Sequence, residues 1–422
     1  MPCPLLRGIV GMYPPPLVIV QPRATSGADW VKPGLLQGRQ PLFWAAASLL
    51  ALLVLLAIAF LAGACYYSNV LRDDALSVEH HAPRYDITVV SVSDNTVTLD
   101  AAKKDAHGDW QQVGVMGLEW PGGYARLGRI LELDRETQVV QRELTLLSGA
   151  LSQGMAVDTD GYSFPFDPVA GRGLDFQEVA VTDSLGNFPA WFVDAGPGAP
   201  WAIFVHGKGG ERQEALRILP TVRDAGFSAL VITYRNDEGL PPDPSGYYRY
   251  GATEWQEVDA AVQWALDHGA PGILLYGYSM GGGVGLSFLY RSPLAPNVCG
   301  VVLDAPMLDL GATIDFRAGQ RGIPSFLTWA GKKLADTRFD IGFGALDYID
   351  NADELDVPVL VIHGELDDDI SITTSRRLAA ERADLVTFEP FENAAHVRSW
   401  NSDPARYEQL VSNFIGGLES CR

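Results

Sequence analysis

Hydrophobic and polar residues follow three different patterns along this 422-residue chain. Residues 42–65 are almost wholly apolar, and no charged residue lies between Arg39 and Arg72. Residues 85–149 alternate with a period near two, which is typical of β-strands with one buried face. From about residue 174 short apolar runs alternate with helical periodicity, which predicts repeated strand–helix units and a mostly parallel sheet flanked by helices.

These patterns divide the chain into five parts. The expected parts are a disordered, proline-rich cytoplasmic tail (1–40), a transmembrane anchor (41–66), a linker (67–84), a small β-rich module (85–170) and an α/β domain (174–418). The fold class is therefore α/β, with a small N-terminal β-rich module and one N-terminal transmembrane helix. No internal repeat is visible.

The apolar run is long enough to cross a membrane. Its 24 residues would extend about 36 Å as a helix, and a bilayer core is about 30 Å thick. Basic residues such as Arg39 precede the run, whereas Asp73 and Asp74 follow it. The positive-inside rule then predicts a single-pass protein of the cell membrane, with a cytoplasmic N-terminus and an extracytoplasmic α/β domain. A signal peptide cleaved after Ala64 and lipidation at Cys65 are the open alternatives to this signal-anchor.

Ser279 lies at the centre of a glycine-flanked pentapeptide, Gly277-Tyr278-Ser279-Met280-Gly281. An apolar, strand-like run over residues 272–276 precedes it, and a helix-like segment follows. A strand, a sharp turn that carries a serine and then a helix form a nucleophile elbow, in which glycines allow the backbone to approach closely. Ser279 is therefore a candidate nucleophile, with Gly277 and Gly281 as supporting glycines.

The acid and the base that such a serine needs follow it in the chain. The order Ser, then Asp or Glu, then His, with each residue after a strand, is typical of α/β-hydrolases. Four acids within residues 365–369 follow a predicted strand that ends at His363, and His396 is the only histidine after them. His396 is therefore the candidate base. We expect His206 and His363, which end strands beside glycines, to orient loops.

Over residues 174–418 the chain resembles an α/β-hydrolase and is similar to membrane-anchored serine hydrolases of actinobacteria and to the serine aminopeptidase and lipase-like group. Residues 363–370, His-Gly-Glu-Leu-Asp-Asp-Asp-Ile, resemble the family's His-Gly-x-x-Asp-x-x-Val pattern, with Ile in place of Val. The resemblance implies that Asp367 is the acid of a triad with Ser279 and His396.

The same resemblance implies an oxyanion hole and a cap. His206-Gly207-Lys208 resembles the family's His-Gly loop, so the backbone N–H groups of Lys208 and Met280 are the expected oxyanion donors, with Gly207 as a further supporting glycine. The Lys208 ammonium is an alternative contact for an anionic substrate. The superfamily often inserts a cap at the position of residues 311–350, where we expect a small cap; its apolar residues are interpreted either as core or as a surface that faces the bilayer.

Composition narrows the range of partners and cofactors. The formal net charge is −21, which makes nucleic acid a poor partner. The four cysteines are scattered and indicate no disulfide framework, although a Cys299–Cys421 bridge stays open. The pair His80-His81 lacks further ligands at a metal-like spacing, so we expect neither a metal nor a cofactor.

The sequence therefore predicts a membrane-tethered serine hydrolase. It would cleave an ester, thioester or amide of a small molecule, lipid or cell-envelope component through an acyl-enzyme. The alternative is a catalytically idle α/β-hydrolase fold that serves as an extracytoplasmic binding or scaffolding module. Neither the exact substrate, nor protein partners, nor the oligomeric state can be deduced from the residues.

Overall fold

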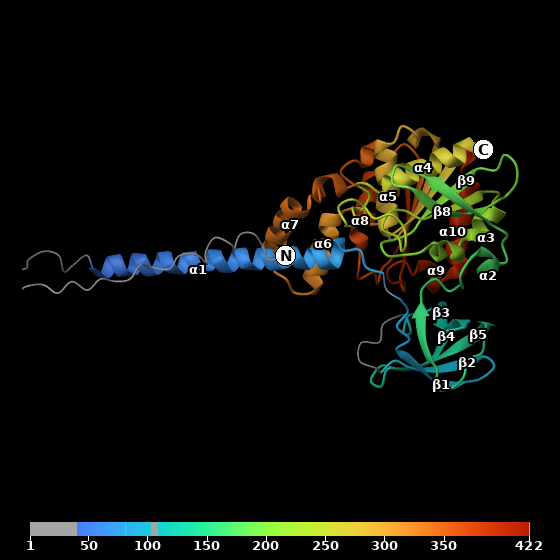
Figure 1. Cartoon of the computed structure of the whole chain (residues 1–422), viewed down its shortest axis with the longest axis horizontal. Helices are drawn as coiled ribbons and strands as arrows, with labels where there is room; N and C mark the ends of the chain where they lie inside the picture. The colour runs from blue at the N-terminus through green and yellow to red at the C-terminus, as the bar shows by residue number, and fades with distance from the viewer. Residues whose placement is uncertain (1–39, 81, 103–108, 422) are drawn as a thin grey trace, which may run out of the picture.

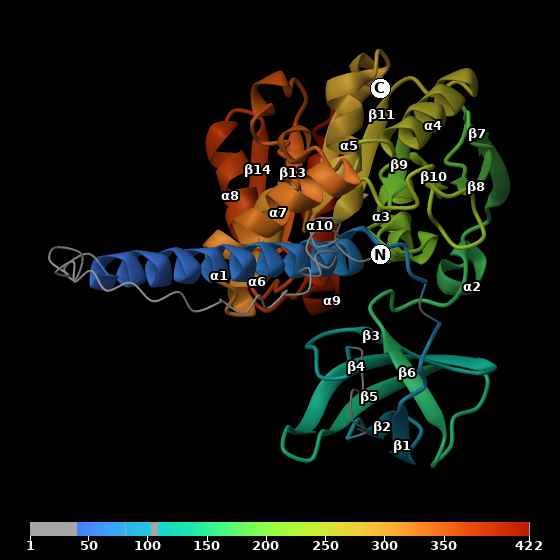
Figure 2. The same ribbon diagram turned by 60° about the vertical axis from the view of Figure 1, so that its left-hand side comes forward.

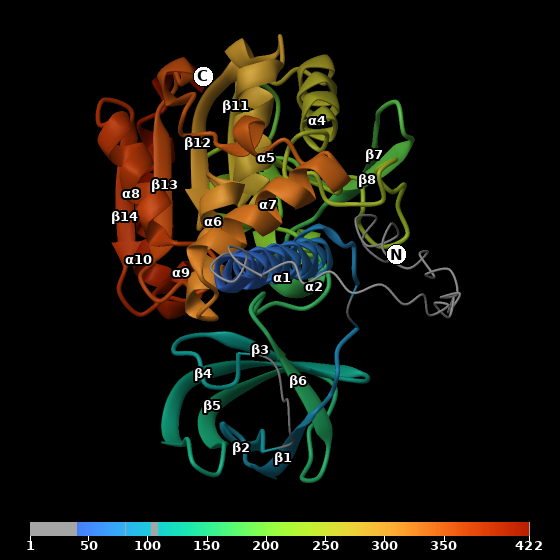
Figure 3. The same ribbon diagram turned by 90° about the vertical axis from the view of Figure 1, so that its left-hand side faces the viewer.

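A single long helix projects from a two-part body in the computed structural model of the protein, which describes residues 40–80, 82–102 and 109–421 (Figure 1). The two parts of the body are a closed six-stranded barrel and an eight-stranded sheet. Figures 2 and 3 show them on opposite sides of the line of the long helix. The tail expected over residues 1–40 lies, except for Gln40, outside the described residues.

The long helix is α1 (Gln40–Leu71), which a π-helical turn (Arg72–Leu76) follows. Together they form the one helix among the described residues that is long and apolar enough to span a membrane. Side chains over residues 43–62 are largely exposed, whereas most of those from Gly63 to Leu71 are partly or fully buried. The linker expected from residue 67 is thus helical at its start, because this part of α1 packs on the rest of the protein.

A closed barrel comes next in the chain. Its strands are β1 (Ile87–Val92), β2 (Thr96–Asp100), β3 (Met116–Trp120), β4 (Gly123–Asp134), β5 (Val139–Ser148) and β6 (Ala156–Asp160), in the order β1-β2-β5-β4-β3-β6. All neighbours pair antiparallel, and side chains such as Val97, Leu118 and Leu127 fill the interior. Because closure pairs each of these six strands on both sides, the described part of the β-rich segment has no free sheet edge.

The α/β domain is built on a mixed sheet. Its strands are β7 (Gln177–Thr182), β8 (Asn187–Val193), β9 (Trp201–Val205), β10 (Ser228–Ile232), β11 (Ile273–Tyr278), β12 (Val298–Asp304), β13 (Val359–Gly364) and β14 (Val386–Phe391), in the order β14-β13-β12-β11-β9-β10-β8-β7. Strand β8 runs antiparallel to both neighbours, and the pairs among β9 to β14 are parallel. The mostly parallel sheet agrees with the expectation.

Helices cover both faces of this sheet and bury the parallel strands, as such strands require. The helices are α2 (Pro168–Arg172), α3 (Leu219–Asp224), α4 (Trp255–Asp267), α5 (Met280–Arg291), α8 (Ile372–Glu381), α9 (Ser399–Ser402) and α10 (Pro404–Gly416). One apolar core joins the sheet to α4, α5 and α8, and a second joins it to α3 and α10.

Two further helices, α6 (Leu310–Gln320) and α7 (Ser325–Phe339), follow β12, and α7 packs against α1 (Figure 1). Small residues allow this packing. A Cβ atom on Gly331 would lie 3.0 Å from the Cβ atom of Tyr67, and one on Gly63 would lie 3.1 Å from Leu327 Cδ2. The α6–α7 hairpin occupies the segment expected as a cap and is held directly by the candidate membrane helix.

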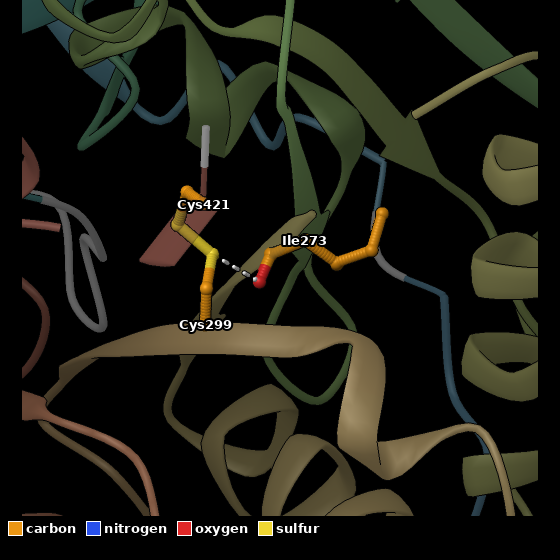
Figure 4. Close-up of a disulfide and its surroundings, with 3 residues drawn as sticks. All are labelled: Ile273, Cys299 and Cys421. Atoms are coloured by element: carbon orange, nitrogen blue, oxygen red, sulfur yellow. Dashed lines mark hydrogen bonds between the residues drawn. A yellow bond between two sulfur atoms is a disulfide. The ribbon is translucent and has the colours of Figure 1, made fainter. Parts of the chain in front are cut away.

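A disulfide joins Cys299, at the start of β12, to Cys421 in the last turn of the chain (Figure 4). Their Cα atoms are 5.2 Å apart, and Cys299 Sγ lies 3.1 Å from the carbonyl oxygen of Ile273. A Cβ atom on Gly272 would lie 2.9 Å from the Cys421 carbonyl oxygen, so this glycine lets the chain end approach. The structure contains the bridge that the sequence left open. Spacing alone could not decide it, because 122 residues separate the two cysteines, which the fold brings together.

Removal of this disulfide should destabilise the protein. We expect Cys299→Ala/Cys421→Ala to lower the free energy of unfolding by about 2–5 kcal/mol, because the bond closes a long loop in the unfolded chain. Urea unfolding of the full-length protein in detergent measures the change. Cys421→Ala alone should lose a similar amount, and an unchanged unfolding midpoint in the double variant would contradict the prediction.

Candidate active site

Ser279 lies in the turn between β11 and α5 with strained backbone angles, φ 49° and ψ −118°. A residue other than glycine in such a region costs on the order of 1–3 kcal/mol, so its surroundings must enforce it. The Ser279 N–H donates to the Asp304 carbonyl oxygen at 2.9 Å, and the Ser279 carbonyl accepts from the N–H groups of Gly282 at 3.0 Å and Met307 at 2.9 Å. These bonds anchor the turn to the end of β12.

The three supporting glycines lie where a side chain would collide with backbone or with Ser279. A Cβ atom on Gly277 would lie 2.6 Å from Gly282 Cα, and one on Gly281 would lie 2.1 Å from the Val205 carbonyl oxygen. One on Gly207 would lie 3.1 Å from Ser279 Cβ. The elbow and the loop after β9 therefore pack against each other through glycines.

The structure brings Ser279, His396 and Asp367 together. His396 Nε2 is 2.8 Å from Ser279 Oγ, and His396 Nδ1 is 2.7 Å from Asp367 Oδ2. The three residues follow β11, β14 and β13, so they meet at the carboxyl edge of the parallel strands. Their sequence neighbours make other contacts: Glu365 pairs with Arg376 and Asp369 with Arg317.

The Asp367 carboxylate is fully buried but has several hydrogen-bond donors. Besides His396, Oδ2 lies 3.0 Å from His363 Nε2, and Oδ1 accepts from the N–H groups of Asp369 at 2.9 Å and Ile370 at 2.8 Å. Burial alone would raise the pKa of Asp367, but the bonds from His363 and His396 hold that pKa well below its usual range. The carboxylate is therefore charged at any physiological pH.

His363 is a second histidine on the same carboxylate. Its Nε2 faces two acceptors, Asp367 Oδ2 and, at 3.2 Å, the Ile370 carbonyl oxygen, so Nε2 carries the proton. Its Nδ1 lies 2.8 Å from Ser375 Oγ. His363 thus locks the Asp367 side chain in position, and its place at the end of β13 was the sequence signal for such a role.

His396 combines partial exposure with a charged partner. Its side chain is 20% exposed. Burial lowers the pKa of His396, but the hydrogen bond that its Nδ1–H donates to Asp367 and the negative charge of that carboxylate outweigh burial and raise this pKa above its ordinary value. The histidine is thereby a stronger base toward Ser279 than an isolated imidazole.

The loop after β9 is fixed by His206, as the sequence analysis expected, and by residues that the sequence analysis did not assign to the site. The Gly207 carbonyl oxygen lies 2.9 Å from His206 Nδ1 and accepts from Tyr234 Oη and from the Gly210 N–H, each at 3.1 Å. In a planar trans peptide the next N–H points opposite to the carbonyl, so the Lys208 N–H is directed away from these donors. Met280 is the first residue of α5, where a helix leaves its N–H groups without intrahelical acceptors.

His206 itself is held between two acceptors. Its Nδ1 faces Gly207 O, and its Nε2 lies 3.0 Å from Asp237 Oδ2. Burial opposes a charge on this ring, but the Asp237 carboxylate raises the pKa of His206. Glu214 Oε2 accepts from the Gly207 N–H at 3.0 Å. His206, Glu214 and Asp237, which come from three separate segments, thus all bind or orient the loop after β9. Their spacing in the sequence does not indicate that they meet.

The barrel holds the loop that carries His396. Asn401 Nδ2 donates to the carbonyl oxygens of Val115 at 2.7 Å and Gly161 at 2.9 Å, and the Val115 N–H donates back to the Asn401 carbonyl at 2.8 Å. Arg398 forms an ion pair of 2.7 Å with Asp109. The sequence analysis found no chemistry in the β-rich module; the structure links it to the histidine loop.

A cavity of about 250 Å³ lies over Ser279 and His396. Its walls come from three elements: the end of α1, the α6–α7 hairpin and the loops at the carboxyl edge of the sheet. Residues that line it include Tyr67, Val70, Leu71, Leu310, Ile314 and Ile323. The Lys208 side chain also reaches it, but its Nζ donates to the Asp74 carbonyl oxygen at 2.8 Å. Among the described residues no group of three or more His, Cys, Asp and Glu side chains is placed to hold a metal ion.

No protein-family model and no curated protein matches the sequence. Several solved structures of hydrolases resemble the fold. An esterase of Pyrococcus furiosus aligns with 59% of this chain and 93% of its own, at 19% identity and a TM-score of 0.48. A thermophilic carboxylesterase from a metagenomic library aligns with 58% and 90%, at 18% identity and a TM-score of 0.44. A bacterial membrane phospholipase A aligns with 58% and 86%, at 17% identity and a TM-score of 0.42.

The raised pKa of His396 predicts the pH dependence of Ser279 reactivity. Only neutral His396 can accept the serine proton, so the rate constant for phosphonylation of Ser279 by a fluorophosphonate should rise with pH through a midpoint above about 6.5. Asp367→Asn should move this midpoint down and lower the plateau about 10⁴-fold, because burial then acts on His396 without the charge. Asp368→Asn, an exposed neighbour, should leave the profile unchanged. A native midpoint at or below 6.5 would contradict this prediction.

Proposed function

We propose that the protein is a membrane-tethered serine hydrolase of the α/β-hydrolase type, which cleaves an ester, thioester or amide through an acyl-enzyme on Ser279. The observation that supports this most is the continuous chain of hydrogen bonds from Ser279 Oγ through His396 to Asp367, with a raised pKa on the base and a lowered one on the acid. The cavity over Ser279 gives a substrate access to this chain.

Acylation follows from these contacts. His396 Nε2 takes the proton of Ser279 Oγ as that oxygen attacks the substrate carbonyl, and Asp367 stabilises the resulting imidazolium. The backbone N–H groups of Lys208 and Met280 donate to the oxyanion of the tetrahedral intermediate. When this intermediate collapses, the imidazolium protonates the departing alcohol, thiol or amine, and Ser279 keeps the acyl group.

Deacylation repeats the steps with water. Neutral His396 removes a proton from a water molecule that attacks the acyl-enzyme carbonyl, the same two N–H groups stabilise the second oxyanion, and the protonated histidine returns the proton to Ser279 Oγ. The products are a carboxylic acid and the free enzyme. Every proton is moved by a residue of this chain.

The proposed location is the cell membrane, with the α/β domain outside the cytoplasm. The exposed length of α1, residues 43–62, corresponds to about 30 Å, the thickness of a bilayer core. The Cys299–Cys421 disulfide is typical of proteins in an oxidising compartment. Ala64, the end of the alternative signal peptide, is 4% exposed within a continuous helix, which supports an uncleaved anchor.

Nucleophile and base variants test the proposed activity. In full-length protein in detergent, Ser279→Ala and His396→Ala should each abolish fluorophosphonate labelling and lower ester hydrolysis by about 10³-fold or more. Ser184→Ala and His268→Ala, which lie away from the site, should behave as the native protein. If folded native protein shows neither labelling nor hydrolysis, the fold serves instead as an idle binding or scaffolding module.

A further inference from the structure

The candidate membrane helix is also a wall of the cavity over Ser279. Tyr67, Val70 and Leu71, in the last turns of α1, line that cavity, and Asp74 and Ala75 of the following turn continue the wall. The exposed part of α1 ends near residue 62. At 1.5 Å per residue, residues 67–71 lie about 8 to 14 Å beyond it along the helix axis. The headgroup layer extends about 5–8 Å beyond a bilayer core, so this wall lies at the outer boundary of that layer and is continuous with the exposed part of α1.

Several contacts fix this geometry, so that the site cannot move freely relative to the bilayer. Arg338 of α7 donates to Ser68 Oγ at 2.8 Å and to Asn69 Oδ1 at 2.9 Å. Tyr250 Oη donates to the Ala75 carbonyl oxygen at 2.7 Å, and Arg321 forms an ion pair with Asp74. The anchor is therefore bonded to α7, to the turn between α6 and α7 and to the sheet domain, and acts as part of the enzyme instead of a flexible tether.

Two exposed aromatic side chains lie at the start of α7, and one of them contacts the exposed part of α1. Phe326 and Trp329 at the start of α7 are each 58% exposed, and the Phe326 ring stacks on Phe60 of α1 with centroids 6.3 Å apart. Figure 1 shows this hairpin on the side of the α/β domain from which α1 projects. Aromatic residues at this level are typical of membrane interfaces, and the apolar surface is continuous with the candidate span.

The cavity lining combines apolar and polar residues. Val70, Leu71, Leu310 and Ile314 contribute apolar side chains from α1 and α6. The polar lining includes His396 and Asp369, which pairs with Arg317 at 3.0 Å. This combination suits an amphiphile whose acyl chain contacts the apolar residues of α1 and α6 and whose ester reaches Ser279.

We propose that the substrate is an acyl ester of a membrane lipid in the outer leaflet. Its acyl chain enters the cavity between α1 and the α6–α7 hairpin, while Phe326 and Trp329 insert into the same leaflet. The lipid thus leaves the bilayer along the anchor without crossing water. This inference rests on the proposed serine hydrolase activity.

Full-length protein in phosphatidylcholine vesicles tests the route, with a fluorogenic acyl ester lipid in the vesicles and p-nitrophenyl acetate in solution. Phe326→Ser/Trp329→Ser should lower the rate on the vesicle-borne ester at least tenfold. The rate on the acetate should stay within twofold, because neither residue lines the cavity. Phe166→Ser is the matched control: Phe166 is 63% exposed, follows the barrel, and should affect neither substrate.

A second variant tests the acyl path itself. Val70→Trp narrows the cavity beside α1, so the ratio of rates on a dodecanoyl ester to an acetyl ester, both in detergent, should fall at least tenfold.

Two outcomes would overturn the lipid route. In the first, the native protein and Phe326→Ser/Trp329→Ser cleave the vesicle-borne ester at equal rates. In the second, the native protein cleaves the acetate but not the vesicle-borne ester. An unchanged chain-length ratio in Val70→Trp would overturn the acyl path. If a fluorophosphonate does not label the native protein, the proposed serine hydrolase activity itself is contradicted.

Discussion

The strained backbone at Ser279 is the constraint on which the site depends. Its dihedral angles are held only because β12 lies beside β11 and binds the turn through Asp304, and because Gly277 and Gly281 leave room for neighbouring backbone. The buried parallel strands provide the rigidity that this strain requires. The same strands end at one edge, so the order of the sheet also sets where the acid and the base stand. The order of the strands thus determines both the fold and the positions of Ser279, Asp367 and His396.

A buried charge is the second organising feature. Asp367 has no exposed side-chain surface, and a carboxylate in that position is tolerated only with donors on both oxygens. His363, His396 and two backbone N–H groups provide them. On the other side of the serine, His206 and Asp237 hold the loop after β9 in a comparable way. Ser279 therefore lies between two loops, each fixed by a histidine and a carboxylate.

Much of the sheet and the central residues of the site could be predicted from the sequence, because their signals are local. The glycines around Ser279, the chain order of Asp367 and His396, and the periodicity of buried strands are all visible within short segments. Other features depend on contacts between distant residues. Closure of the barrel, the bonds from Asn401 to Val115 and Gly161, the Cys299–Cys421 bridge and the packing of α1 on Gly331 leave no pattern that spacing or composition can indicate.

The link between the barrel and the histidine loop has a consequence for biogenesis. The barrel is made early and pairs only with itself, so it can close before the sheet domain is synthesised. His396, Arg398, Asn401 and Cys421 all belong to the last segment of the chain, which must find the finished barrel and the start of β12. A nascent polypeptide that still lacks this segment has Ser279 but not His396. The hydrogen-bonded group of Ser279, His396 and Asp367 therefore assembles only after this last segment has been made and has folded.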